Sequence, residues 1–249
     1  MIPTWLTYLS IGMLTLGFLC AAIIALDLAM GHKQHMWIMN FVWPITALFG
    51  TVLSVYFYFK YGRLAADRYV KAAAENDEPP PNMAKTPFPA MVGKGAAHCG
   101  SGCTLGDICA EFLALAFPVV ATWVGWKSLF PDTHHGKIFA VWILDFILAF
   151  GFGVLFQYFT IVPMRGLSPG RGIIEAIKAD TLSLTAWQVG MYGLMAIAHF
   201  YIFTKIWEAK VTPDMPVFWF VMQIAMLGGF ATSYPVNWWL ISKGIKEKM

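Results

Sequence analysis

Six long apolar stretches constrain the fold of this chain more than any other feature. They fall at about residues 5–30, 36–60, 104–126, 138–163, 183–207 and 215–241. A helix that crosses a bilayer needs roughly 20 mostly apolar residues, and each stretch meets that length. Only 12% of the residues are charged, whereas soluble domains carry about 25%. The sequence therefore predicts an all-α integral membrane protein, a six-helix bundle arranged as two plus four spans.

Lysine and arginine positions predict the orientation of the bundle. If both termini are cytosolic, 12 of the 17 basic residues fall on the cytosolic side, as the positive-inside rule requires. The first stretch has no basic start and no cleavage site, so we expect a retained helix and not a signal peptide. The net charge of +3 then reflects topology. With no basic patch interleaved with aromatic residues, we expect the lipid bilayer as partner and no nucleic acid.

The soluble part of the chain is small. We expect residues 1–60 to form the first two transmembrane helices and residues 61–103 to form a cytosolic connector. Residues 104–249 would then form a four-helix transmembrane region. Three prolines at 79–81 interrupt any helix that continues from the second span, since proline lacks the backbone donor. The rest of the connector is rich in Pro and Gly and is predicted to be irregular.

The connector ends in an unusual density of thiols, imidazole and carboxylates. Thr104 and Asp107 have the spacing of a helix N-terminal capping pair, which predicts a helix start at 104 and a flexible loop before it. Cys103 would then precede the positive end of the helix dipole, an environment that favours the thiolate. If the helix starts earlier, four of these side chains share one face at successive i,i+4 positions. The motif reads His98-Cys99-Gly-Ser-Gly-Cys103-Thr-Leu-Gly-Asp107-Ile-Cys109-Ala-Glu111.

We interpret His98, Cys99 and Cys103 as a candidate metal site. An imidazole and two thiolates suit Cu(I) or another soft metal better than a hard cation, and the spacing does not match a closed zinc site. A disulfide between the two cysteines is an alternative that a reducing cytosol disfavours. Asp107 has a capping role available to it, but Glu111 has none, and acids inside a membrane are functional by default. We therefore expect both acids to lie on a substrate or proton path.

A second polar layer is predicted in the outer half of the membrane. Four helices place a polar side chain at similar depth, and such groups avoid lipid and pair with one another. Methionines at comparable levels provide soft thioether ligands, although methionine is also a common core residue. The members of this layer are Asn40, Asp145, His199, Gln223, Met195, Met222 and Met226.

Three segments together resemble a known bacterial membrane family. They are the thiol motif above, the Met39-Asn40-Phe-Val-Trp-Pro44 segment at the start of the second helix, and Pro235-Val-Asn237-Trp-Trp-Leu-Ile-Ser-Lys-Gly-Ile-Lys near the C-terminus. The chain is similar in these segments to the family called domain of unknown function 4396. The resemblance covers most of the chain, from the second helix onward. It implies a small multi-spanning protein of a bacterial or archaeal inner membrane, and it implies no established activity.

The residues predict a membrane transporter or carrier of a soft metal ion, with Cu(I) as the leading candidate. Neither a nucleotide cofactor nor an enzymatic activity is expected, because no phosphate-binding or hydrolase motif is present. Two alternatives remain open. One is a membrane thiol-redox or electron-transfer protein that uses Cys99 and Cys103, or His199 as a haem ligand. The other is a subunit or assembly factor of a larger membrane complex, and a homo-oligomer is a further alternative.

Overall fold

The chain folds into a bundle of long helices. The structure, a computed structural model, describes residues 1–248 of 249, and no strand occurs among them. The helices are α1 (Thr4–Asp27), α2 (Met39–Phe57), α3 (Asp67–Glu75), α4 (Pro81–Ala84), α5 (Phe88–Ala116), α6 (Val119–Trp123), α7 (His134–Arg165), α8 (Pro169–Ala196) and α9 (Pro216–Ser242). Further helical segments extend three of them: η1 (Leu28–His32) follows α1, η2 (Tyr58–Gly62) and η3 (Arg63–Ala65) follow α2, and η4 (Ile197–Ile206) follows α8. Six helices are long and apolar enough to cross a membrane, so the all-α prediction is confirmed.

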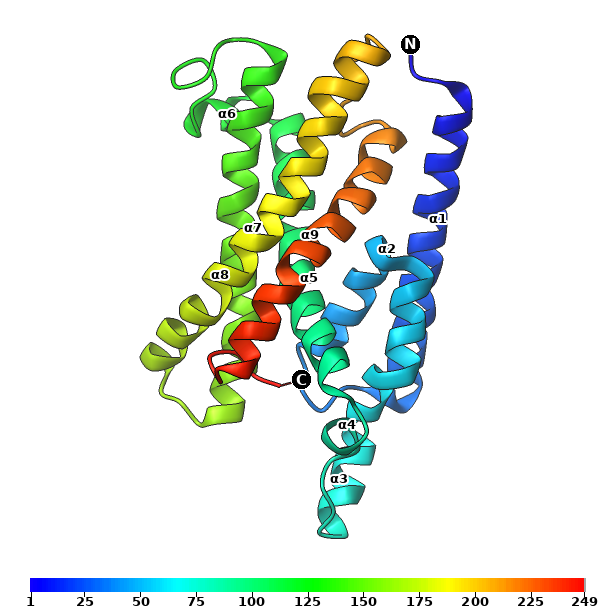
Figure 1. Cartoon of the computed structure of the whole chain (residues 1–249), viewed down its shortest axis with the longest axis vertical. Helices are drawn as coiled ribbons and strands as arrows, with labels where there is room; N and C mark the ends of the chain where they lie inside the picture. The colour runs from blue at the N-terminus through cyan, green and yellow to red at the C-terminus, as the bar shows by residue number, and fades with distance from the viewer. Residues whose placement is uncertain (249) are drawn as a thin grey trace.

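The second of these six helices folds back on itself and forms a re-entrant hairpin. Thr51 has φ 43° and ψ −124°, which is not helical, and it divides α2 into two arms. The two arms run side by side, and the ring of Trp43 in one arm packs against the ring of Tyr58 at the end of the other, with centroids 5.5 Å apart. The two ends of the hairpin also meet, since the His35 N–H donates to the Ala65 carbonyl at 2.9 Å. Residues 39–50 rise about 18 Å at helical pitch, so the tip of the hairpin lies inside the bundle and does not reach its far end (Figure 1).

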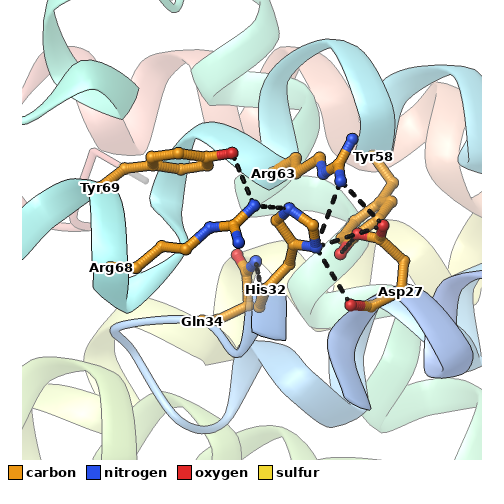
Figure 2. A network of polar contacts seen from close by, with 7 residues as sticks. All are labelled: Asp27, His32, Gln34, Tyr58, Arg63, Arg68 and Tyr69. Atoms are coloured by element: carbon orange, nitrogen blue, oxygen red, sulfur yellow. Dashed lines mark hydrogen bonds and ion pairs between the residues drawn. The ribbon is translucent and has the colours of Figure 1, made fainter. Parts of the chain in front are cut away.

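A buried polar network fixes the base of the hairpin to the end of α1 (Figure 2). Tyr58 Oη donates to Asp27 Oδ2 at 2.7 Å, and Arg63 Nη2 lies 3.2 Å from Asp27 Oδ1. Arg68, at the start of α3, contacts His32, which lies in the turn after α1. Asp27 and His32 are both buried. Such paired charges need defined geometry to offset their desolvation, so the network fixes the direction in which the hairpin enters the bundle.

Helices α3 and α4 project beyond the bundle at the hairpin base (Figure 1). Asp67 begins α3, and its carboxylate lies 2.6 Å from Lys71 Nζ and 2.8 Å from His35 Nδ1. Hydrogen bonds from Lys71 and His35 hold the pKa of Asp67 below its usual value. The first turn of α3 is therefore anchored to the hairpin by a carboxylate that stays ionised.

The two termini lie at opposite ends of the bundle (Figure 1). The N-terminal ammonium contacts the carbonyl of Trp207, just after the extended α8. The C-terminal tail contacts Arg165, which ends α7 at the other end of the molecule. The hairpin does not run the length of the bundle, so in this structure the termini do not lie at the same end, whereas the sequence predicts the same end for six full-length helices. We call the end that holds the hairpin base, α3, α4 and the C-terminus the basic end, since only Lys127, Lys137, Lys205 and Lys210 of the 17 lysines and arginines lie at the opposite end.

Candidate functional site

The central helix α5 carries the thiol motif, and it begins much earlier than predicted. It starts at Phe88, so residues 99–103 are helical and the predicted helix start at 104 is wrong. Thr104 is not an N-cap, because its hydroxyl donates to the Gly100 carbonyl within the helix at 2.8 Å. The connector predicted for residues 61–103 therefore ends near residue 87 in the structure. The glycines that suggest a loop in the sequence serve helix packing in the structure.

Close packing of α5 against α7 explains those glycines. A Cβ on Gly102 would lie 3.0 Å from the Gly153 Cα, and one on Gly106 would lie 2.9 Å from the Ala149 Cβ. Small residues four apart let membrane helices approach at backbone distance. The contacts also fix the register, so that Asp145 of α7 faces the turn of α5 between Asp107 and Glu111.

Four side chains of α5 form a line along its buried face, as expected for a helix that starts before residue 99. Cys99, Cys103, Asp107 and Glu111 follow one another at i,i+4 spacing, and each is at most 7% exposed. We call these four residues the α5 line. All four cysteines of the chain are free thiols. The line runs from near the basic end toward the opposite end of the bundle.

His98 does not join the two thiols. Its Nε2 lies 3.0 Å from Thr160 Oγ1 of α7, and its ring packs against the edge of Phe156. Within residues 1–248, no group of three or more His, Cys, Asp or Glu side chains is placed to hold a metal ion. The three predicted ligands are thus divided in this structure, with Cys99 and Cys103 on one face of α5 and His98 on a neighbouring face.

Three carboxyl groups lie in the same region of the bundle interior, although within residues 1–248 they are not placed close enough to hold one metal ion together. Asp107 and Asp145 are fully buried, and neither has a hydrogen-bond partner for either side-chain oxygen. Glu111 is an ionisable neighbour of both, and Lys137 is in turn an ionisable neighbour of Glu111. We call Asp107, Glu111 and Asp145 the acidic cluster. Unpaired carboxylates at such positions are strongly disfavoured, so these groups are neutral or bind a cation when the protein is at rest.

Two cavities reach the acidic cluster from different directions. A cavity of about 430 Å³ opens between α1, the hairpin tip, α5 and α9, and Asp107 lies in its wall. A smaller cavity of about 90 Å³ opens at the opposite end and includes Glu111. The predicted polar layer is divided between them: Gln223, Met222 and Met226 line the first cavity, His199 lines the second, and Met195 is a buried core residue nearby.

Gln223 connects the hairpin tip to α9. Its Nε2 donates to the Leu48 carbonyl, three residues before the bend at Thr51, at 2.6 Å. Backbone that leaves the helix at membrane depth needs such partners and commonly lines cavities. The side-chain oxygen of Gln223 remains without a partner.

Asn40 lies far from the rest of the predicted layer, and its assignment there is wrong. It sits at the hairpin base near the basic end, where its Oδ1 accepts from the Gln34 N–H at 2.9 Å and its Nδ2 donates to the Trp37 carbonyl. The error follows from the direction of α1, which ends at the basic end and not at the opposite one. Asn40 therefore stabilises the turn that leads into the hairpin.

A polar cluster at the basic end was not expected from the sequence. Lys246 is 1% exposed, and its Nζ lies 2.7 Å from Asn237 Oδ1 and 3.2 Å from Ser183 Oγ. Asp180 is fully buried one turn before Ser183, and both of its carboxyl oxygens lack partners. A helix start at 169 in place of 183 would have marked Asp180 as a membrane acid. Nothing in the sequence distinguishes Lys246 from the solvated lysines of the tail.

Together these features define a multi-pass α-helical membrane protein with a line of buried ionisable groups on its central helix. A sequence model of the family described as Domain of unknown function (DUF4396) matches residues 90–246. That match covers more than half of the chain, so the chain belongs to this family. It includes α5 and the helices after it, whereas the hairpin precedes it. No curated protein and no solved structure matches the chain.

Proposed function

We propose that this protein moves a small cation across the membrane along the α5 line, with Cu(I) as its cargo. The observation that carries the proposal is the acidic cluster, whose members Asp107 and Asp145 have no partner for any side-chain oxygen. Buried carboxylates left without partners destabilise a fold by several kcal/mol. Apolar residues in their place would make the bundle more stable, so their presence favours a role in which they bind a cation or a proton.

The two thiols support a soft cargo. Cys103 lies one helical turn and Cys99 two turns from Asp107, toward the basic end, and both thiols are free and fully buried. Thiolates and thioethers select Cu(I) over hard cations, and Met222 and Met226 line the cavity beside Asp107. In this proposal the thiols and then the acidic cluster bind the metal ion in turn, and each group releases its own proton to water when the ion binds.

Burial of the thiols argues against the redox alternative. Dithiols that exchange electrons with partners are accessible to them, whereas Cys99 and Cys103 are both 0% exposed. The large cavity is lined by Asp107 and Thr104 and not by either cysteine. Cargo binding within the bundle needs no such exposure, because the ion itself is small.

Metal uptake into proteoliposomes tests the proposal. We expect vesicles with wild-type protein to take up Cu(I), kept reduced by ascorbate, at least about tenfold faster than empty vesicles. Asp107→Asn and the double variant Cys99→Ser/Cys103→Ser should each reduce uptake to the level of empty vesicles. Removing a required ion partner inside a low-dielectric site has effects of this size.

Two matched variants control for general effects of substitution. Cys109 is an exposed thiol on the same helix, and Asp132 is an acid whose side chain is 63% exposed in the loop before α7. Cys109→Ser and Asp132→Asn should therefore leave uptake unchanged. No uptake by the wild-type protein would overturn transport of Cu(I). Loss of uptake in Asp107→Asn but not in the thiol variant would overturn the role of the thiols.

A further inference from the structure

The C-terminal tail turns back into the bundle after α9. Gly244 has φ +69°, a conformation that suits glycine, and it reverses the chain. The N–H groups of Ile245 and Lys246 then reach the Leu240 carbonyl at 3.0 and 3.3 Å. This turn directs Lys246 inward, while Lys243 before it stays exposed.

The buried ammonium of Lys246 is held by oxygen atoms of two helices. Asn237 Oδ1 of α9 accepts from it at 2.7 Å, and Ser183 Oγ of α8 lies at 3.2 Å. Asn237 Nδ2 also donates to Ser183 Oγ at 2.8 Å, which fixes the amide so that its oxygen faces the ammonium. The Lys246 ammonium is therefore bound in a buried polar site that side chains of α8 and α9 form.

Asp180 of α8 lies next to this site, and its polar neighbours include the Cys99 thiol of α5 and the Lys246 ammonium. Neither carboxyl oxygen of Asp180 has a partner at hydrogen-bond geometry, and Asp180 and Lys246 do not form an ion pair within 4.0 Å in the described residues. Gly153 of α7 makes room for it, since a Cβ there would collide with Asp180 Oδ2. The site thus contains one carboxylate with spare ligand capacity beside a tethered cation.

The site adjoins the thiol end of the α5 line. A Cβ on Gly95 would lie 3.8 Å from Asn237 Oδ1, and Cys99 is one helical turn further in on the same face. A cation that enters the α5 line from the basic end would meet Asp180, Ser183 and Asn237 first. Lys246 occupies that position.

A second set of contacts holds the tail from outside. Arg165, at the end of α7, forms an ion pair with Glu247 and donates from Nη2 to the Gly244 carbonyl at 3.0 Å. We call these contacts of Arg165 the arginine clamp. The clamp and the buried Lys246 ammonium hold neighbouring residues of the same six-residue tail. Releasing either would weaken the closure of the basic end.

We propose that Asp180, Ser183 and Asn237 form a binding site for a small monovalent cation, and that the Lys246 ammonium occupies it as a tethered competitor. The proposal rests on the proposed function in placing this site on the transport path, and it names the first binding position on that path. The tail then closes the path from the basic end, and an incoming cation opens it by displacing Lys246.

Thermal unfolding of the full chain in nanodiscs tests the site without measuring transport. Lys246→Gln removes the competitor, and we expect its Tm to rise by about 3 °C with a tenfold excess of bound cation over Kd. The probes are NaCl, KCl, NH4Cl and ascorbate-reduced Cu(I), with N-methyl-D-glucamine chloride as the ionic-strength control. The wild-type protein should show no such shift, because Lys246 already occupies its site. The double variant Lys246→Gln/Asp180→Asn should also show none, because it lacks the carboxylate.

Reaction of Cys99 with N-ethylmaleimide, followed by mass spectrometry of its peptide, tests the closure. Arg165→Gln leaves the buried site intact and releases the clamp, so it serves if Lys246→Gln does not fold. Lys246→Gln and Arg165→Gln should each increase the rate of Cys99 labelling at least about tenfold, since opening of a closed segment controls labelling. Lys243→Gln should leave that rate unchanged.

The outcomes separate the three ideas. Failure of every cation to raise the Tm of folded Lys246→Gln would overturn the site. An unchanged Cys99 rate in both variants would overturn the closure. Absence of transport with an intact Tm shift would count against the proposed function alone.

Discussion

At the scale of single residues, buried ionisable groups distinguish this protein from an inert bundle. Asp107, Asp145 and Asp180 are each 0% exposed with unpartnered oxygens, whereas Asp27 is buried with Tyr58 and Arg63 as partners. The contrast separates two roles. A paired acid such as Asp27 fixes local geometry, while an unpaired acid in hydrocarbon needs a proton or a cation.

Thr51 is the residue whose backbone makes the hairpin possible. A threonine at φ 43° and ψ −124° is strained by about 1–3 kcal/mol. Glycine adopts this conformation freely and loses about 0.5–1 kcal/mol in chain entropy. Thr51→Gly should therefore raise the free energy of unfolding by about 1 kcal/mol, measured by thermal unfolding in nanodiscs.

The matched control is Thr185→Gly, an exposed threonine in the regular part of α8. Glycine in a regular helix is less favourable than threonine by about 0.5 kcal/mol, so this variant should be slightly destabilised. If Thr51→Gly is destabilised to the same degree, the bend is not strained and the hairpin is held by its contacts alone.

The sequence indicates the acids that lie within the six predicted apolar stretches but not the acids that lie just outside them. Glu111 and Asp145 stand out because nothing in a lipid-facing helix explains them. Asp180 lies outside the predicted apolar stretch, which begins at 183, whereas α8 begins at Pro169. Lys246 could not be found from the sequence, because only the turn at Gly244 directs it inward.

At the scale of helices, the contact between α5 and α7 positions the whole site. Gly106 and Ala149 meet at backbone distance, and this contact places Asp145 beside the α5 line. The same glycines made α5 difficult to predict. In a soluble protein Gly-Ser-Gly indicates a loop, but in a membrane bundle small residues mark the closest helix contacts.

Substitution of Gly106 should separate these two helices. A Cβ at this position would overlap the backbone of Ala149, which cannot rotate away as a side chain can. Overpacking of this kind destabilises by about 1–3 kcal/mol, so Gly106→Ala should lower the Tm and also lower Cu(I) uptake. Gly151→Ala, on α7 with no atom within 4 Å of its added Cβ, is the control and should change neither. Equal effects of the two variants would show that glycine flexibility, and not close packing, is what α5 and α7 require.

The hairpin shows why hydropathy predicts the existence of helices better than their paths. Residues 39–65 are apolar and long enough to cross, and the bend falls at a threonine and not at a glycine or proline. The direction of the chain is decided by tertiary contacts, such as the donation from Gln223 to the Leu48 carbonyl. A property averaged over 20 residues does not contain that information.

At the scale of the whole molecule, the hairpin reverses the direction of α1 relative to a bundle of six full-length crossings. It also increases the difference in the number of lysines and arginines between the two ends. Lys33 moves to the basic end, so thirteen of the 17 lysines and arginines lie there. The positive-inside rule predicts that the basic end lies in the cytosol, with the C-terminus inside and the N-terminus outside. The cation site beneath the tail then faces the cytosol.

Cysteine accessibility in intact cells tests this topology. In a Cys109→Ser background, we expect Thr4→Cys to react with a membrane-impermeant maleimide without permeabilisation, because α1 begins at the outer end. Lys33→Cys and Lys243→Cys should react only after permeabilisation. Asp132→Cys, in an exposed loop at the same end as Thr4, provides the control for outside labelling.

Lys33 separates the two topologies most clearly. Six crossings with cytosolic termini would place Lys33→Cys outside and Thr4→Cys inside, which is the reverse of the labelling expected here. The difference has a functional consequence, since the large cavity beside Asp107 is walled by α1 and the hairpin tip. If α2 crossed fully, Leu48 would lie in a continuous helix, and no hairpin tip would be present for Gln223 to contact. Labelling of Lys33→Cys from outside would therefore contradict the hairpin and the cavity together.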